Sequence, residues 1–324
     1  MERKPKKIYE IKYLGWTKAY IDKAKRVSFP GFDKVPVFDV ALFFIRGIRD
    51  GAIITRAESV AFNFILALFP TVLVFFTLIP LIPIDNFQTQ ILSLIQSIVP
   101  ETTYSVIQRT IEDIIIIKRG GLFSIGFVVA LIFSTNGIVS LIQSFNASIH
   151  VEDTRSWLKQ RTISLMLVVI LSLLVTLGIM LITFTQTLML LLVHKGVMQQ
   201  NWTYYLVTGG KWVVILALFY FAYSFVFYFG PAKKSKYRFI SVGATLATAL
   251  TILVTVGFGF FIDHFGRYNA LYGSIGTLPV IMLMIFLNSL SMILGFELNI
   301  GIVAARKVNG TKSVEKKGGP GKGE

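Results

Sequence analysis

Polar side chains recur at helical spacing inside three long apolar stretches of the sequence. They are Glu58, Ser59 and Asn63 in the first stretch, Asn136, Ser140, Gln143 and Asn146 in the second, and Asn288, Ser291, Glu297 and Asn299 in the third. In the second stretch the first three are four and three residues apart and share one helix face, whereas Glu297 lies nearly opposite the face that carries Asn288, Ser291 and Asn299. Carboxylates and amides are costly in lipid and usually face a bundle interior or water. We therefore expect a polar cavity that opens to the cytoplasm.

A structural role explains the same residues. Single amides in membrane helices often only hydrogen-bond to a neighbouring helix. Glu58 lies near a helix start, where its side chain can reach the membrane surface beside Arg56. An ion pair between Arg56 and Glu297 is a further candidate. The sequence leaves both the cavity and the structural role open.

The residues that support common catalytic sites are missing or scattered. The chain has no cysteine, which excludes thiol nucleophiles and zinc–thiolate sites. Its histidines, His150, His194 and His264, are isolated from one another, and no carboxylate lies at metal-site spacing from them. No glycine-rich loop ends in Lys-Ser or Lys-Thr, so no nucleotide site of that kind is expected. We expect no catalytic residue, no metal, no cofactor and no enzyme activity.

The composition indicates that these polar groups lie in a membrane protein. Of the 324 residues 54% are hydrophobic and only 15% are charged, against about 25% charged in soluble domains. The net charge is +15, but the basic residues fall in short loops and tails without the extended face that nucleic-acid binding needs. We expect anionic membrane lipids as partners and no nucleic acid.

The long apolar runs predict an all-α fold, a polytopic bundle of six transmembrane helices with amphipathic interfacial helices. The predicted spans cover residues 57–83, 122–148, 162–193, 211–229, 239–262 and 275–305. They form a transmembrane domain of residues 51–305, which includes an amphipathic extracytoplasmic loop over 84–121. Residues 1–50 are expected to form a basic amphipathic cytoplasmic segment, and residues 306–324 a disordered Lys/Gly-rich tail.

The distribution of basic residues predicts the orientation. With six spans, 26 of the 32 Lys and Arg residues fall on the side of the two termini. Because cytoplasmic loops carry the excess of Lys and Arg, we expect both termini in the cytoplasm and the protein in a bacterial plasma membrane.

Several motifs resemble those of the YihY/BrkB family of bacterial inner-membrane proteins. They are the stretch 59–70 that ends in Leu68-Phe69-Pro70, Ser140-Leu141 with Asn146, Gly230-Pro231 with Tyr237-Arg238 and Val242-Gly243-Ala244, the loop YNALYGSIG from Tyr268 to Gly276, and Leu294-Gly295-Phe296-Glu297-Leu298-Asn299. The five occur in the family's order over about residues 40–305. Ala67 and Phe296 depart from the family pattern, which often has Ser and Ala at these positions.

The resemblance implies a role in the cell envelope, since the family is associated with envelope integrity, serum resistance and lipid movement. It has also carried a ribonuclease label, for which these residues offer no catalytic group. The leading hypothesis is a transporter or flippase for an amphipathic lipid or envelope precursor. The alternatives are a membrane scaffold for envelope biogenesis and, last, a membrane-embedded hydrolase.

Overall fold

The computed structural model describes residues 23–25, 27–32, 35–78, 120–148, 153–194, 202–232, 238–264 and 277–317. The predicted amphipathic loop over 84–121 lies almost wholly outside these residues. So do half of the basic N-terminal segment of residues 1–50, the loop from Tyr268 to Gly276 and the tail beyond Lys317.

Long helices make up the described chain. They are α2 (Val37–Asp50), α3 (Ile53–Leu78), α6 (Gly120–Ser148), α7 (Trp157–His194), α8 (Trp202–Phe229), α9 (Val242–His264) and α11 (Thr277–Lys317). All but α2 are long and apolar enough to cross a membrane, which makes six candidate spans. The described residues contain no strand. The predicted fold class, an all-α membrane bundle with six long helices, is confirmed.

Several helices extend beyond the predicted spans. Helix α7 begins at Trp157 and not at residue 162, so it includes Arg161. Helix α8 begins at Trp202 and continues through Gly209 and Gly210. Helix α11 runs on to Lys317, where the sequence predicted disorder from residue 306. Composition marks where the apolar run ends, but alanine, arginine, lysine and glutamate are good helix formers and keep the backbone helical past that point.

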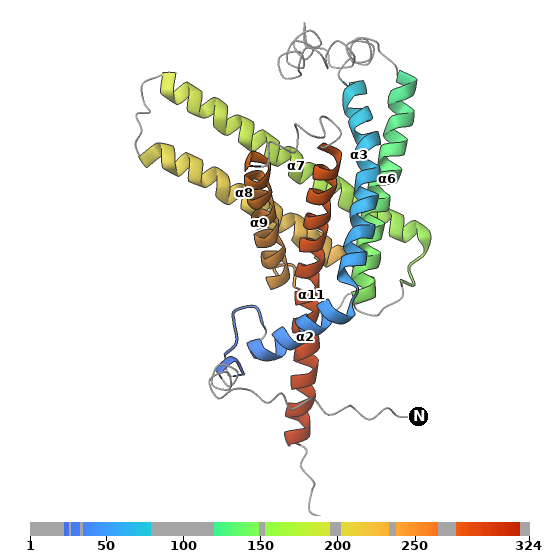
Figure 1. The fold of residues 1–324 in the computed structure, drawn as a ribbon, viewed down its shortest axis with the longest axis vertical. Helices are drawn as coiled ribbons and strands as arrows, with labels where there is room; N and C mark the ends of the chain where they lie inside the picture. Colours follow the sequence, from blue (N-terminus) through green and yellow to red (C-terminus); the bar gives the residue numbers. More distant parts are fainter. Residues whose placement is uncertain are drawn as a thin grey trace, which may run out of the picture.

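The helices form a bundle in which neighbours along the chain are mostly neighbours in space (Figure 1). Helices α3 and α6 lie side by side, and α11 packs against α3, α9 and α2. Helices α7 and α8 form a second pair, which crosses the others at a steep angle and extends away from α3 and α6 (Figure 1). Helix α7 contacts α6, and α8 contacts α9.

Helix α2 lies across the end of the bundle at which α3 begins and α6 ends (Figure 1). We call this the α2 end. The chain turns from α2 into α3 at Gly51 and Ala52, and Ala52 has a positive φ of 46°. One face of α2 packs on α11, where Gly301 approaches the backbone of Phe44 and Asn309 donates a hydrogen bond to Asp39. The other face exposes Ile45 and Ile48, as in a helix that lies on a membrane surface.

Three phenylalanines form the centre of the core at the α2 end. Phe145 of α6 stacks on Phe296 of α11, with ring centroids 4.1 Å apart. Phe227 of α8 lies 5.6 Å from each of these rings. All three side chains are buried. The aromatic cluster joins α6, α8 and α11 and fixes the helix faces on which the polar residues lie.

Candidate functional site

A buried ion pair joins α3, α6 and α11 at the α2 end. Arg56 Nη2 lies 2.7 Å from Glu297 Oε1, and their side chains are 12% and 4% exposed. Glu297 Oε1 also accepts a hydrogen bond of 2.6 Å from the Ser148 hydroxyl. Arg56 Nη1 donates to the Ser144 carbonyl at 2.8 Å and to Ser148 Oγ. The structure thus brings Arg56 and Glu297 together and closes their charges off from the membrane.

Glycines make room for this pair on the neighbouring helix α2. A Cβ atom on Gly47 would lie 2.7 Å from Glu297 Oε2, and one on Gly51 would lie 2.8 Å from Arg56 Nη2. The turn from α2 into α3 therefore packs directly on the charged groups. Any larger residue at Gly47 would have to displace the carboxylate.

A second group of polar residues lies along the contact between α3 and α6. Ser59 Oγ and Ser140 Oγ are 3.2 Å apart, and Asn63 donates to the Ser59 carbonyl at 2.9 Å. Ser59 is exposed, Asn63 is half-buried, and Gln143, one turn from Ser140, is exposed. We call Ser59, Asn63, Ser140 and Gln143 the α3–α6 polar strip. Glu58, also exposed, lies beside it on α3.

Asn299 lies on a different side of α11, against α9. Its Oδ1 accepts a hydrogen bond of 2.9 Å from the Gly243 amide, and its Nδ2 donates to Ser241 Oγ at 3.1 Å. Gly295, on the same face, touches the Gly243 backbone. Asn299 therefore does not line a common cavity with α3 and α6, contrary to expectation, because its helix face packs on α9.

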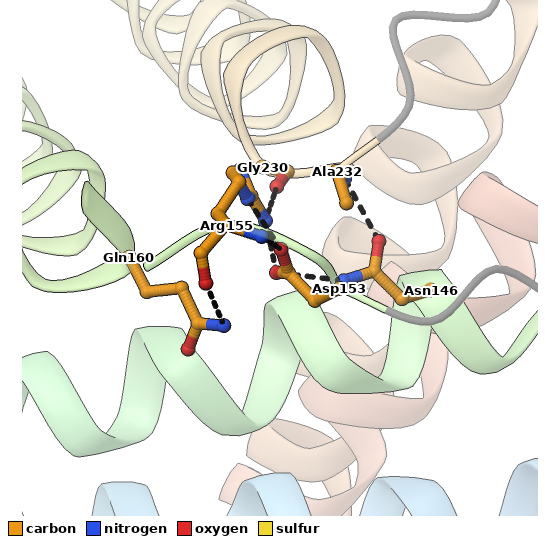
Figure 2. A network of polar contacts seen from close by, with 6 residues as sticks. All are labelled: Asn146, Asp153, Arg155, Gln160, Gly230 and Ala232. Carbon is orange, nitrogen blue, oxygen red and sulfur yellow. Dashed lines mark hydrogen bonds and ion pairs between the residues drawn. The ribbon is translucent and has the colours of Figure 1, made fainter. Parts of the chain in front are cut away.

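Asn146 belongs to a network that ties α6 to the start of α7 and the end of α8 (Figure 2). Its Nδ2 donates to Asp153 Oδ2 at 3.1 Å, and its Oδ1 accepts from the Ala232 amide at 2.8 Å. Asp153 pairs with Arg155 at 2.5 Å, and Arg155 also donates to the Gly230 carbonyl at 3.1 Å. The hydrogen bonds from Arg155 hold the pKa of the Asp153 carboxyl below its usual value. We call these residues the Asp153 network; it makes Asn146 a structural residue.

The remaining predicted residues occupy separate positions. Asn136 accepts a hydrogen bond of 2.6 Å from Arg161 of α7. Asn288 and Ser291 donate to the carbonyls of Met284 and Leu287 one turn earlier in α11. Asn288 Oδ1 is buried without a partner among the described residues.

Sequence reasoning missed several polar groups that the fold brings together. Arg161 was counted as a loop residue because the third span was expected to begin after it. Asp153 and Arg155 fall in the loop between the second and third predicted spans, where their spacing of two residues allows a local ion pair. The hydroxyl oxygens of Tyr223 on α8 and Thr251 on α9 are 2.5 Å apart. Both side chains are buried, so leaving either hydroxyl without a hydrogen bond would cost free energy. No pattern in the sequence signals this last contact.

The polar residues thus divide into contacts that hold helices together and groups that remain accessible. The buried ion pair, the Asn299 contact and the Asp153 network belong to the first kind. Arg161 and three residues of the α3–α6 polar strip, Ser59, Asn63 and Gln143, belong to the second, whereas Ser140 is buried. Within the described residues, no group of three His, Cys, Asp or Glu side chains could hold a metal ion.

The chain is similar to several bacterial proteins. It is 27% identical over 245 residues to a protein of Bacillus subtilis (strain 168) named putative ribonuclease-like protein YfkH, and the match covers 76% of this chain and 88% of the relative. It is 25% identical over 297 residues to a UPF0761 membrane protein of Xanthomonas axonopodis pv. citri, covering 90% of this chain. A UPF0761 membrane protein of Xanthomonas euvesicatoria matches at the same identity and coverage. The chain spans about 65% of the length of the former and 64% of the latter.

No solved structure matches the chain. The family described as Virulence factor BrkB matches residues 44–318, which include every described helix from the middle of α2 to the end of α11. The resemblance expected from the sequence motifs is thereby confirmed. The chain is an integral membrane protein that belongs to the BrkB family.

Proposed function

We propose that this protein moves an anionic amphipathic lipid or envelope precursor between the leaflets of a bacterial plasma membrane, with both of its termini in the cytoplasm. The observation that carries the proposal is the α3–α6 polar strip. Ser59 and Gln143 are exposed on helices whose surroundings are apolar, and Asn63 is half-buried beside them. Polar side chains on the outer surface of membrane helices are costly and usually mark a pathway.

The strip suits a lipid head group better than a soluble solute. A head group can follow polar side chains on the bundle surface while its acyl chains stay in the hydrocarbon. Ser59 and Ser140 are close enough to share a hydrogen bond, so the two helices offer one continuous line of donors and acceptors. Asn63 extends that line one turn deeper along α3.

The buried ion pair has a supporting role in this proposal. Because Arg56 is bound to Glu297 and Ser148, its charge is compensated and it does not attract the head group. Glu297 remains the candidate for coupling to a proton or cation gradient, since it is a buried carboxylate whose protonation would free Arg56.

Reconstitution into liposomes tests the proposal. We expect the wild-type protein to accelerate the exchange of a fluorescent anionic lipid between leaflets. Replacing Asn63 and Gln143 by leucine should slow exchange severalfold, because the strip then offers apolar surface to the head group. Thr245→Leu is the matched control, since Thr245 is an exposed polar residue on α9, away from the strip.

Glu297→Gln addresses coupling in the same assay. Slower exchange only when a proton gradient is imposed would support the coupling role. If the wild-type protein accelerates none of several anionic lipids, with or without a gradient, lipid movement is excluded.

A scaffold is the second candidate function. Helix α11 continues to Lys317, beyond the candidate span that ends at Asn309, and carries Lys312, Lys316 and Lys317 there. A basic helical extension is suited to recruiting an acidic partner protein. Truncation after Asn309, which keeps the contact of Asn309 with Asp39, would then abolish recruitment of the partner while leaving lipid exchange unchanged.

A further inference from the structure

Arg161 places a guanidinium between two apolar helices, near the start of α7. It lies on α7 within the candidate span Trp157–Leu181 and is half-buried. Its Nη1 donates to Asn136 Oδ1 at 2.6 Å and to Thr135 Oγ1 at 3.2 Å, both on α6. These contacts fix the guanidinium between two helices.

The charge of Arg161 is not compensated by the described part of the protein. Two other arginines near the α2 end each bind a carboxylate, Arg56 with Glu297 and Arg155 with Asp153. Among the described residues, the hydrogen bonds of Arg161 go to the neutral oxygens of Asn136 and Thr135. The Thr135 hydroxyl proton is donated to the Ile132 carbonyl, so Thr135 meets Arg161 as an acceptor. A cation in apolar surroundings favours an anion as its remaining neighbour.

The geometry leaves one side of the guanidinium open to such an anion. Among the described residues, Nε and Nη2 of Arg161 donate no hydrogen bond to the protein, and neither is sealed in the interior. These two groups lie along one edge of the guanidinium and can bind two oxygens of a phosphate at once. The indole of Trp157, which is 66% exposed, lies 5.5 Å from Arg161 Cζ and supports the guanidinium through a cation–π contact.

The position of Arg161 near the start of α7 also suits a lipid as the ligand. Trp157 is exposed at the start of a membrane helix, where tryptophan side chains meet the level of the head groups. On α6, Asn136 is one turn from Ser140 and two turns from Gln143, on the same face as the α3–α6 polar strip.

We propose that Arg161, held by Asn136 and Thr135 and backed by Trp157, binds the phosphate group of an anionic phospholipid. The proposal rests on the proposed function, for which it names the head-group contact, but the binding can be measured without transport. The bound phosphate compensates the guanidinium, and the acyl chains lie along the exposed apolar surface of α7, at Leu165 and Val169.

Lipid binding to the purified full chain in detergent tests the proposal. The probe is phosphatidylglycerol, titrated against phosphatidylcholine, with bound lipid counted by native mass spectrometry and the melting temperature followed in parallel. We expect phosphatidylglycerol to bind in preference to phosphatidylcholine. Arg161→Gln should weaken that binding at least tenfold, and Arg161→Lys severalfold, because an ammonium lacks the two-donor edge. Lys159→Gln is the matched control, since it removes one exposed positive charge two residues away.

A second titration with inorganic phosphate separates the two sources of a phosphate group. The lipid assignment is overturned if inorganic phosphate raises the melting temperature of the wild type but not of Arg161→Gln, while phosphatidylglycerol leaves both melting temperatures unchanged. Unchanged phosphatidylglycerol binding in Arg161→Gln would also overturn it. Should Arg161→Gln fail to fold, Arg161→Lys decides, and equal affinity of that variant and the wild type counts against the proposal.

The binding and exchange measurements fail independently. If Arg161 binds phosphatidylglycerol but the wild type moves no lipid in liposomes, the Arg161 site is supported and the transport function is contradicted. If the wild type moves lipid but Arg161→Gln binds phosphatidylglycerol as well as the wild type does, transport is supported and the Arg161 site is contradicted.

Discussion

Among the polar residues of this bundle, Arg56 and Glu297 are structural because each compensates the charge of the other. Glu297 is 3% exposed and accepts hydrogen bonds from Arg56 and Ser148, which belong to two other helices. Removing two charges from water is costly, and their attraction repays that cost only when the geometry is good. The pair is therefore less a source of net stability than a constraint on how α3, α6 and α11 meet.

Variants of this pair should show strong coupling. Arg56→Gln and Glu297→Gln each leave one buried charge without its partner, which costs about 3–5 kcal/mol in proteins where it has been measured. We expect the double variant to lose less stability than the sum of the two single variants. Thermal unfolding of the purified protein measures this, with Glu58→Gln as the control because Glu58 is exposed. Additive losses would show that the two charges do not act as a pair.

Helical spacing identified the polar residues, and Arg56 with Glu297 was a candidate pair, but spacing did not identify the partners of Asn299 or Asn146. Asn299 and Glu297 are two residues apart, so the sequence places them on different faces of one helix, as observed. Which helix meets each face depends on the packing of Phe145, Phe227 and Phe296, which no local pattern encodes. Arg161 was missed for a different reason. A span boundary predicted five residues too late turned an arginine of the bundle into a loop residue.

At the scale of elements, glycine sets the closest helix contact. Gly243 of α9 and Gly295 of α11 bring their backbones together, and a Cβ on Gly295 would lie 2.5 Å from the Gly243 carbonyl oxygen and 2.7 Å from Ala247 Cβ. Small residues allow such an approach in membrane helices, where packing and hydrogen bonds replace the hydrophobic effect as the force between helices. The contact of α9 with α11 thus depends on Gly243, Gly295 and the hydrogen bonds of Asn299.

Gly295→Ala should therefore separate α9 from α11. Its methyl group meets backbone and Ala247, neither of which can rotate away, so overpacking should cost about 1–3 kcal/mol. The Asn299 hydrogen bonds to Gly243 and Ser241 should weaken with it. A lower melting temperature in detergent checks this. Gly257→Ala is the control on α9, since no atom lies within 4 Å of its added Cβ, and it should be neutral or slightly stabilising.

Helix existence was easier to predict than helix ends. Six apolar runs of sufficient length predict six spans because lipid forces every backbone group to bond within its own helix. The ends depend on weaker effects. Pro70 stays within α3, and α8 continues through Gly209 and Gly210, although both residue types often interrupt helices.

The whole molecule consists of a tight group and a looser pair. Helices α3, α6, α9 and α11 are joined by the buried ion pair and by the contact of Gly243 with Gly295. Helices α7 and α8 cross them and are held at the α2 end by the Asp153 network (Figures 1 and 2). Away from that end, α7 exposes Leu173, Ile179 and Phe184, as expected for a surface in contact with lipid.

Orientation in the membrane can be tested at this scale because the chain has no cysteine. A single cysteine at Ser97 or Gln199 should react with an impermeant thiol reagent added outside intact cells. A cysteine at Ser235 or Ser313 should react only after the membrane is opened. The expectation follows because 26 of the 32 Lys and Arg residues fall on the side of the two termini, and an excess of basic residues predicts the cytoplasmic side. The opposite labelling pattern would show that the bundle has the reverse orientation. Labelling of cysteines at Ser235 and Ser313 from different sides would contradict the predicted number of spans.

Helix α11 is longer than a bilayer is thick. Its 41 residues give a length of about 62 Å, twice the hydrocarbon thickness of about 30 Å. The part beyond Gly295 is held by α2, where Gly301 approaches the backbone of Phe44 and Asn309 donates a hydrogen bond to Asp39. We therefore expect a change in the tilt of α11 within the bundle to carry α2 with it.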